Sequence, residues 1–190
     1  MRVPVYVLDR HIHLSKLDSE KLFWKWYVFE KWKRFTQPWE YFATEKVKIQ
    51  WPKWKIENID ILLPFRKYTQ VEIFESDNNI LWTNAKVFSS WKLEDAEAIT
   101  IIWPKWSVYL PHGMIIESPH IHMSVAQSED FWFRNNQIVN VKTHWENEQI
   151  IENVKIRVND KYEFDFHINK ELGNKYWLAT NDWAEILSYK

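Results

Sequence analysis

The chain has 190 residues, a formal net charge of −1 at pH 7 and no cysteine. The near-neutral charge gives no electrostatic basis for binding nucleic acid or an anionic membrane. The lack of cysteine excludes disulfides, thiolate metal ligands and a cysteine nucleophile. No apolar run approaches the roughly 18 residues of a membrane span, so we expect a soluble cytoplasmic chain of one or two domains.

Alternating apolar residues and β-branched content predict strands along most of the chain. The predicted strands are 3–14, 47–50, 55–62, 70–74, 99–102, 107–110, 114–117, 138–142, 149–158 and 162–168. Short helices are predicted at 16–24, 78–81 and 128–132, and the pattern over 27–35 is mixed. Many short strands with few brief helices favour a mainly β fold built from barrels.

Two His-Ile-His segments, His11–His13 and His120–His122, hold four of the seven histidines. Side chains two residues apart on a strand share one face, and neutral imidazole is the commonest protein metal ligand. Each segment therefore predicts a metal-binding pair. A hydrogen-bonded or surface pair of histidines is the alternative for either segment alone, and the repetition favours metal binding.

A helix-start signal follows each of these segments. Ser15 stands three residues before Asp18, and Ser124 stands three residues before Gln127, which is the spacing of an N-cap hydroxyl and its partner. The same strand–turn–helix unit thus occurs twice, as internal duplication would produce.

The tryptophan and glycine contents are both unusual, with 14 Trp and 2 Gly, although glycine averages about 7% of residues. Trp39 follows a proline, the segment Phe23-Trp24-Lys25-Trp26 ends the first predicted helix, and Trp-Pro-Lys-Trp turns occupy 51–54 and 103–106. Turns and helix ends of these kinds favour glycine. We hypothesise that most of these tryptophans are glycines in the natural protein, because UGA encodes tryptophan in one variant genetic code and glycine in another. A truly Trp-rich binder of carbohydrate or stacked bases is the alternative.

With tryptophan read as glycine, the chain resembles the PduL-type phosphate acyltransferases, the phosphate propanoyltransferase family, from Val3 to Ile186. The motifs that carry this resemblance are, in chain order, Arg10-His-Ile-His-Leu-Ser15, Gln37-Pro-Trp, Trp51-Pro-Lys-Trp-Lys-Ile-Glu-Asn58, Pro64-Phe-Arg-Lys-Tyr-Thr-Gln-Val-Glu-Ile73, Trp103-Pro-Lys-Trp-Ser107 and His120-Ile-His-Met-Ser124. Such a series in this order is hard to obtain by chance.

The resemblance implies a mainly β fold of two β-barrel domains capped by short helices and related by internal duplication. One domain would cover 10–117, and the other would combine 1–9 with 118–190, because the N-terminal strand would complete the C-terminal barrel. The implied reaction exchanges coenzyme A and phosphate on a short-chain acyl group at a site of two Zn²⁺ or other divalent ions.

The resemblance also implies two sets of metal ligands, which are His11, His13 and Glu72 for one ion and His120, His122 and His167 for the other. Three N/O ligands per ion is the number that catalytic zinc sites use. Arg66 is implied to bind phosphate, a role that suits its planar guanidinium. Lys33, Asn174 and His167 are implied to lie around coenzyme A.

Taken without the resemblance, these residues have simpler interpretations. Glu72 in Val-Glu-Ile would face solvent, His167 in Phe-His-Ile would be a hydrogen-bonded core histidine, and Arg66 would be a surface ion-pair partner. The chain offers no obvious Ser-His pair for a covalent route, which favours direct attack by phosphate on the acyl group.

The expected partners are acyl-CoA and phosphate, with a homodimer allowed and neither nucleic acid nor a membrane expected. The amphipathic extension that targets some members to bacterial microcompartments is missing, which favours the cytoplasm over a microcompartment lumen. A non-catalytic metal- or ligand-binding β protein derived from the family is an alternative function. Two departures from the family pattern support this alternative: Leu8 stands where the family usually has serine, and Asp60 stands where it often has a basic residue. A Trp-mediated carbohydrate-binding module is a third.

Overall fold

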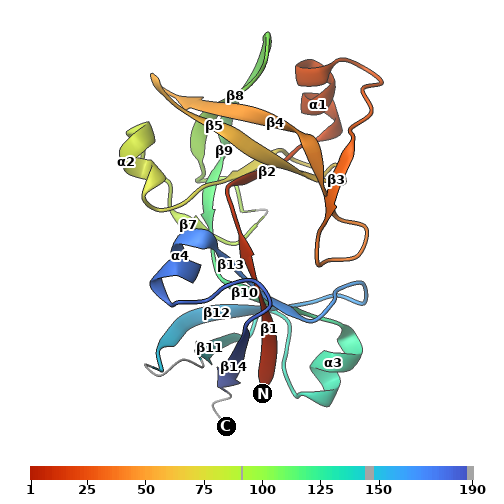
Figure 1. Cartoon of the computed structure of the whole chain (residues 1–190), viewed down its shortest axis with the longest axis vertical. Helices are drawn as coiled ribbons and strands as arrows, with labels where there is room; N and C mark the ends of the chain where they lie inside the picture. The colour runs from red at the N-terminus through yellow and green to blue at the C-terminus, as the bar shows by residue number, and fades with distance from the viewer. Residues whose placement is uncertain (91, 144–147, 188–190) are drawn as a thin grey trace. The chain divides into compact units, whose positions relative to one another are not determined.

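The computed structural model describes residues 1–90, 92–143 and 148–187. These residues form short helices and many strands (Figure 1), and contacts divide the chain into two compact units. Unit 1 comprises 1–8, 36–38 and 118–190, and unit 2 comprises 9–35 and 39–117. Across the described ranges, no helix is both long and apolar enough to cross a membrane.

Unit 2 contains a closed ring of six strands. In order around the ring these are β2 (His11–His13), β5 (Trp54–Leu63), β4 (Tyr41–Trp51), β8 (Glu97–Trp103), β9 (Trp106–Glu117) and β6 (Gln70–Glu72), which pairs again with β2. Two further strands, β3 (Lys31–Arg34) and β7 (Val87–Phe88), pair with β4 and β9. The helices α1 (Lys16–Phe23) and α2 (Asp77–Leu81) follow β2 and β6 along the chain.

Unit 1 contains a second closed ring of six strands. In order around the ring these are β1 (Arg2–Leu8), β13 (Asp165–Asn169), β10 (His120–Met123), β12 (Ile150–Val158), β11 (Ile138–Lys142) and β14 (Trp183–Leu187). Figure 1 shows the red N-terminal strand β1 beside the blue strands β13 and β14, with which it pairs. The helices α3 (Val125–Asp130) and α4 (Lys170–Lys175) follow β10 and β13.

The two barrels share one pattern of strand directions. The His-Ile-His strand runs parallel to one neighbour and antiparallel to the other, as β2 does with β5 and β6 and as β10 does with β12 and β13. The next pair, β6–β9 or β13–β1, is parallel, and the three remaining pairs are antiparallel. This repeated topology confirms the predicted mainly β fold of two duplicated barrels.

Each barrel is built around a core of aliphatic and aromatic side chains. The alternation read from the sequence is visible in β4, where Val47 and Ile49 are buried and Lys46 and Lys48 are exposed. Ile12 and Ile121, the central residues of the two His-Ile-His segments, are fully buried in their respective cores. Burial of these two residues anchors the strands that carry the histidines.

The predicted strand 3–14 is wrong in its continuity, because β1 and β2 are separate strands joined by Asp9 and Arg10. The Arg10 side chain donates two hydrogen bonds to Asp77, at 2.6 and 2.8 Å. Asp77 in turn accepts the backbone N–H of Phe74 at 2.9 Å. This ion pair fixes the start of β2 next to α2, at the point where the chain passes from unit 1 to unit 2.

Several other boundaries also differ from prediction. The helix predicted at 128–132 is α3 at 125–130, because Ser124 and Gln127 form the capping box and start the helix directly after β10. The strand predicted at 162–168 begins only at Asp165. The strands β3, β7 and β14 and the helix α4 were not predicted; α4 has six residues and depends on its Asn169 cap.

Six tryptophans have left-handed backbone conformations, with φ between 51° and 75°. They are Trp24, Trp26, Trp39, Trp82, Trp132 and Trp177. Their side chains are 52–90% exposed, so packing does not compensate for a conformation that disfavours Cβ. Among the described residues, every left-handed position is held by tryptophan or asparagine. The backbone at these six positions is the one that glycine adopts most readily.

Each of the helices α1 to α4 is followed within one or two residues by such a tryptophan. Trp82, Trp132 and Trp177 follow α2, α3 and α4. In each case the N–H of the residue after the tryptophan donates a hydrogen bond to the carbonyl five residues before that residue, at 3.1, 2.9 and 2.9 Å respectively. This is the Schellman pattern, in which the spanned residue is usually glycine. After α1, Trp24 has φ 75°.

The two Trp-Pro-Lys-Trp turns do not follow the same rule. Trp51, Trp54, Trp103 and Trp106 end or begin hairpin strands and lack positive φ. These four tryptophans therefore lack the left-handed backbone that favours glycine at the six positions above. Trp91 and Trp145 lie outside the described residues.

Replacing a left-handed tryptophan by glycine should raise stability. We expect Trp82→Gly, Trp132→Gly and Trp177→Gly each to increase the free energy of unfolding by about 1 kcal/mol, because they relieve left-handed strain at exposed sites. Urea denaturation measures this change. Trp103→Gly is the opposite control and should lose about 2 kcal/mol, since Trp103 packs on Phe23 at 4.2 Å between ring centroids. Equal destabilisation by all four variants would contradict the glycine hypothesis.

Candidate metal centres

The first candidate centre lies in unit 2 and joins two neighbouring strands. His11 and His13 come from β2 and Glu72 comes from β6, and all three side chains are buried. One ligand atom from each lies within 4.8 Å of the others. The His11 Nε2 is 3.2 Å from one Glu72 oxygen, and the His13 Nε2 is 3.5 Å from the other.

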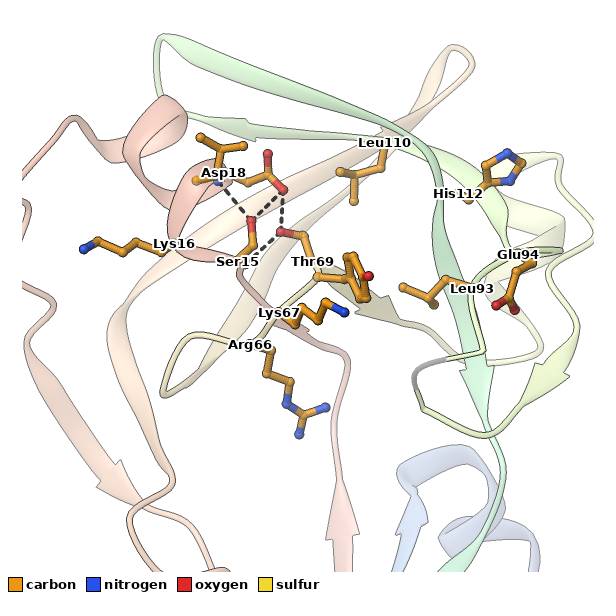
Figure 2. A pocket seen from close by; sticks show the side chains of 12 residues that line it. Ser15, Lys16, Asp18, Arg66, Lys67, Thr69, Leu93, Glu94, Leu110 and His112 are labelled. Carbon is orange, nitrogen blue, oxygen red and sulfur yellow. Dashed lines mark hydrogen bonds between the residues drawn. The ribbon is translucent and has the colours of Figure 1, made fainter.

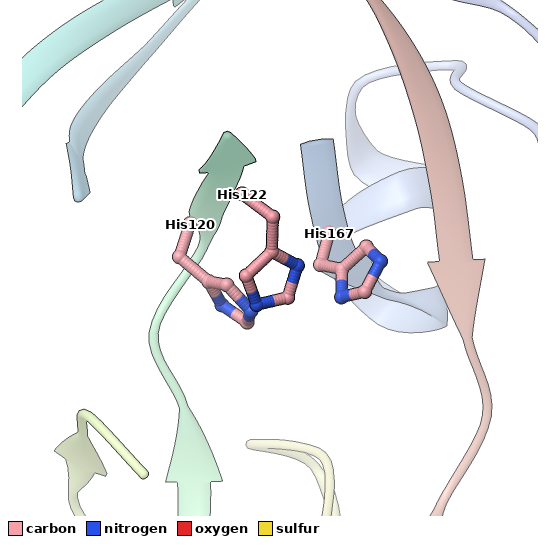
Figure 3. A group of neighbouring side chains, drawn as sticks. All are labelled: His120, His122 and His167. Atoms are coloured by element: carbon pink, nitrogen blue, oxygen red, sulfur yellow. The ribbon is translucent and has the colours of Figure 1, made fainter. Parts of the chain in front are cut away.

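The second candidate centre lies in unit 1 and consists of three buried histidines. His120 and His122 come from β10 and His167 comes from β13, and their rings converge in Figure 3. One nitrogen of each lies within 4.8 Å of the others. The ring centroid of His122 lies 4.6 Å from the ring centroid of His120 and 4.5 Å from that of His167.

Strand register explains why both clusters have the same shape. The two histidines of His-x-His share one face of their strand. The third residue sits directly opposite the first histidine on the antiparallel neighbour: Glu72 is opposite His11 and His167 is opposite His120. Cβ atoms of such opposed residues are about 4.5–5.5 Å apart. Three side chains are therefore brought together by backbone pairing alone.

Backbone carbonyls orient the first histidine of each segment in the same way. The Nδ1 of His11 is 3.0 Å from the Asp9 carbonyl oxygen, and the Nδ1 of His120 is 3.0 Å from the Ser118 carbonyl oxygen. A carbonyl only accepts, so Nδ1 carries the proton and the lone pair of a neutral ring lies on Nε2. In unit 2 that Nε2 faces a carboxylate oxygen, an arrangement of two electron-pair donors that a cation would bridge.

The charges around the unit 2 cluster keep its donors available for a cation. Burial, followed by electrostatic interactions with Arg66 and His11, lowers the pKa of His13 well below its ordinary value of 6.5. Burial raises the pKa of Glu72. The electrostatic interactions with His11 and Arg66, together with a hydrogen bond with Glu117, lower this pKa by more, so the net shift is downward. At neutral pH the cluster thus combines a neutral His13 with an ionised Glu72, the protonation states that metal ligands require.

The three-histidine cluster is tuned in a similar way. Burial and the neighbouring His167 lower the pKa of His122 from 6.5 to about 4, although Asp165 opposes this shift. Burial of Asp165 raises its pKa, but interactions with His167 and His122 lower the pKa by a larger amount. The net shift is downward, so the carboxylate stays ionised. The donor chemistry of both clusters, three nitrogens or two nitrogens and one oxygen, suits Zn²⁺ or a similar divalent ion.

Several buried polar residues beside the clusters were missed by sequence reasoning. In unit 2, Gln70 donates to Glu72 at 2.6 Å and to Ser90 at 3.2 Å, and Ser90 donates to Glu117. In unit 1, Asp165 contacts two of the three histidines. Gln70 and Asp165 each stand two residues before the third ligand, and that spacing was the only sequence signal that could have found them.

The arginine predicted to bind phosphate lies near the unit 2 cluster, since its charge acts on both His13 and Glu72. Arg66 follows β5, and its backbone N–H donates to the Leu14 carbonyl at 2.8 Å. Its guanidinium donates to Glu40 at 3.4 Å. The arginine is therefore held beside the strand that carries His11 and His13.

A cavity of about 650 Å³ borders Arg66 in unit 2. On one side, Asp18 accepts hydrogen bonds from Ser15 at 2.9 Å and from Thr69 at 2.7 Å, and Thr69 accepts the Ser15 N–H at 2.8 Å. Figure 2 shows the Arg66 side chain directed away from this network. The network ties the start of α1 to the loop between β5 and β6, which carries Arg66.

The residues predicted to lie around coenzyme A are in different units. Lys33 is exposed on β3 of unit 2 and borders a hollow of about 300 Å³ with Arg34, Trp39 and Tyr41. Asn174 is exposed near the end of α4 in unit 1. Both remain predictions for ligand binding.

Comparison with known proteins gives a consistent assignment. The family model described as phosphate propanoyltransferase matches residues 4–179. The chain is 36% identical over 188 residues to the phosphate propanoyltransferase of Thermotoga maritima, which covers 98% of this chain and 90% of the relative. It is 35% identical over 188 residues to that of Priestia megaterium, covering 99% of this chain and 87% of the relative. The protein is thus an acyltransferase, as expected. The chain belongs to the phosphate propanoyltransferase family.

The lowered histidine pKa values predict how stability depends on pH in chelator-treated protein. His122 has a folded pKa of about 4 against 6.5 unfolded, so between these values the unfolded chain binds more protons and stability falls as pH decreases. From pH 7 to pH 5 we expect a loss of about 2 kcal/mol from this residue, with His13 adding in the same direction.

Urea denaturation at the two pH values, with EDTA present, measures this loss. Glu72 and Asp165 have lowered pKa values, so they lose their stabilising effect only below this pH range. His122→Gln removes the titrating ring and should flatten the dependence. Identical stability of the wild-type chain at pH 7 and pH 5 would contradict a neutral, buried His122.

Proposed function

We propose that this chain exchanges coenzyme A and phosphate on a short-chain acyl group, in the reaction acyl-CoA + phosphate ⇌ acyl phosphate + CoA. Each candidate centre is proposed to bind one Zn²⁺ ion. The observation that carries the proposal is the repeated three-residue cluster, which has equivalent register in both barrels. Membership of the phosphate propanoyltransferase family supports the reaction.

One ion would be held by His11, His13 and Glu72 and the other by His120, His122 and His167. When bound, Zn²⁺ supplies Lewis-acid chemistry, which polarises the thioester carbonyl and stabilises negative charge on the oxyanion and the departing thiolate. Each proposed set uses three protein ligands, the number that leaves one position open in catalytic zinc sites.

The chain's own residues would bind and orient the phosphate. Arg66 offers a planar guanidinium that can hold two phosphate oxygens, and its backbone anchor to Leu14 fixes it beside the His13 strand. A phosphate oxygen forms the new bond to the acyl carbon as the carbon–sulfur bond breaks, and the thiolate leaves with the bonding electron pair. The chain has no cysteine, so a thioester on the enzyme is excluded and direct attack is the preferred route.

The reaction is tested with acetyl-CoA or propanoyl-CoA and phosphate. We expect formation of acyl phosphate and free CoA, loss of activity on removal of metal by a chelator, and restoration by Zn²⁺. Metal analysis should give two equivalents per chain, and Glu72→Ala and His167→Ala should each remove about one. Two equivalents of metal without turnover of any short acyl-CoA would instead favour the non-catalytic metal-binding alternative.

Arg66 is tested separately through the phosphate dependence of the rate. We expect Arg66→Ala to raise the KM for phosphate at least tenfold, and Arg66→Lys to recover only part of the loss, because a lysine ammonium cannot bind two oxygens in a fixed plane. Lys67→Ala is the matched control, since Lys67 is the adjacent, exposed cation. Equal effects of Arg66→Ala and Lys67→Ala would show that only net charge matters and would contradict the assigned role.

A further inference from the structure

We propose that Asp165 is a positioning residue of the three-histidine cluster, and that Gln37 holds Asp165 in place. The inference rests on the proposed metal-binding function of that cluster. It assigns a role to the Gln37-Pro-Trp motif and to a buried carboxylate, and the reaction scheme above uses neither.

Asp165 makes a bridge between two of the three histidines. It is 4% exposed and stands directly opposite His122 in the β10–β13 register. One carboxylate oxygen is 3.1 Å from the His122 Nδ1, and the other is 2.7 Å from the His167 Nε2. A single carboxylate therefore fixes the orientation of one ring from each strand.

The bridge to His122 determines which nitrogen of that ring can bind a cation. An ionised carboxylate only accepts hydrogen bonds, so the Nδ1 of His122 carries the proton and donates to Asp165. The lone pair then lies on Nε2, as it does in His120, whose Nδ1 faces the Ser118 carbonyl. Outer carboxylates of this kind orient metal-bound histidines and increase their affinity for the ion.

Gln37 holds the same carboxylate oxygen of Asp165 that contacts His167. Its side-chain amide is 3% exposed and donates to an Asp165 oxygen at 2.9 Å and to the Glu163 carbonyl at 3.0 Å. The Gln37 oxygen accepts the Glu163 N–H at 3.2 Å. With both ends of the amide paired to one short segment, Gln37 has a single orientation and presents its N–H to Asp165.

The equivalent position in unit 2 explains why a carboxylate is needed here. Gln70 stands opposite His13 as Asp165 stands opposite His122. In unit 2 the negative charge is on the ligand Glu72 and the supporting residue is the neutral Gln70. In unit 1 the third candidate ligand is the imidazole of His167, and the carboxylate is on the supporting residue Asp165. Counting only the three candidate ligands and the residue opposite the second histidine, each set contains one carboxylate. In unit 1 Asp165 supplies the charge that three histidines lack.

The test measures Zn²⁺ affinity of the three-histidine cluster alone, in a Glu72→Ala parent chain, by competition with a chromophoric chelator. We expect Asp165→Asn to weaken Zn²⁺ binding ten- to hundredfold, because an asparagine has one acceptor oxygen and cannot serve both rings. Asp165→Glu should restore part of the affinity, and Gln37→Ala should weaken binding by a smaller factor. Asp130→Asn is the control for loss of charge, since Asp130 is exposed in the same unit.

A second readout follows the histidine directly and needs no variant. In ¹⁵N NMR of the Zn²⁺-loaded chain, His122 should carry its proton on Nδ1 and bind through Nε2. Zn²⁺ affinity unchanged in Asp165→Asn, or a His122 bound through Nδ1, would overturn the positioning role. A parent chain that binds no Zn²⁺ would overturn the proposed metal function itself, whereas a parent that binds while Asp165→Asn binds equally well would overturn only this inference. If Asp165→Asn does not fold, as judged by circular dichroism, the NMR result on the unmutated chain decides.

Discussion

Both candidate centres depend on one antiparallel register in each barrel. The third candidate ligand stands opposite the first histidine, as Glu72 does with His11 and His167 with His120. A slip of one residue would turn the third side chain to the other face of the sheet. The buried isoleucine between the histidines prevents a slip of β2 or β10, because it would have to leave the core. Hydrophobic packing on one face of the strand therefore fixes the polar cluster on the other.

The duplication gives this geometry twice with different chemistry. The strand order and directions are the same in both barrels, yet a carboxylate is a candidate ligand in one and a supporting residue in the other. The candidate ligands and the residue opposite the second histidine include one carboxylate in each unit, which would offset part of the charge of a divalent ion. The equivalence also relates β1, at the start of the chain, to β9, so the duplicated unit is interrupted in the linear sequence.

The sequence predicted the parts of the site that depend on local patterns. His-Ile-His on a strand and a capping serine after it are short-range signals, and the structure has both. Glu72 and His167 carry no such signal, because their role depends on pairing between strands distant in sequence; only the family resemblance indicated them. Asp165 was missed for the same reason, and Gln37 was recognised only as part of a motif, without a role. The helix α4 and the strand β14 were missed because they are short and carry weak periodicity.

The tryptophans show how backbone conformation can reveal the residue a position requires. Three helices close with Schellman hydrogen bonds around Trp82, Trp132 and Trp177, although glycine is the usual residue there. The fold retains these turns because the hydrogen bonds and barrel packing on either side determine them. The side chains themselves extend outward and contribute little to the core. Composition and backbone thus indicate glycine at these positions independently.

The central claim is that each barrel binds one divalent ion through its three-residue cluster. Anomalous diffraction at the zinc absorption edge, from crystals of the Zn²⁺-loaded chain, tests it most directly. The account predicts one strong peak among His11, His13 and Glu72 and another among His120, His122 and His167. Peaks only at other positions, or empty clusters at saturating Zn²⁺, would contradict it.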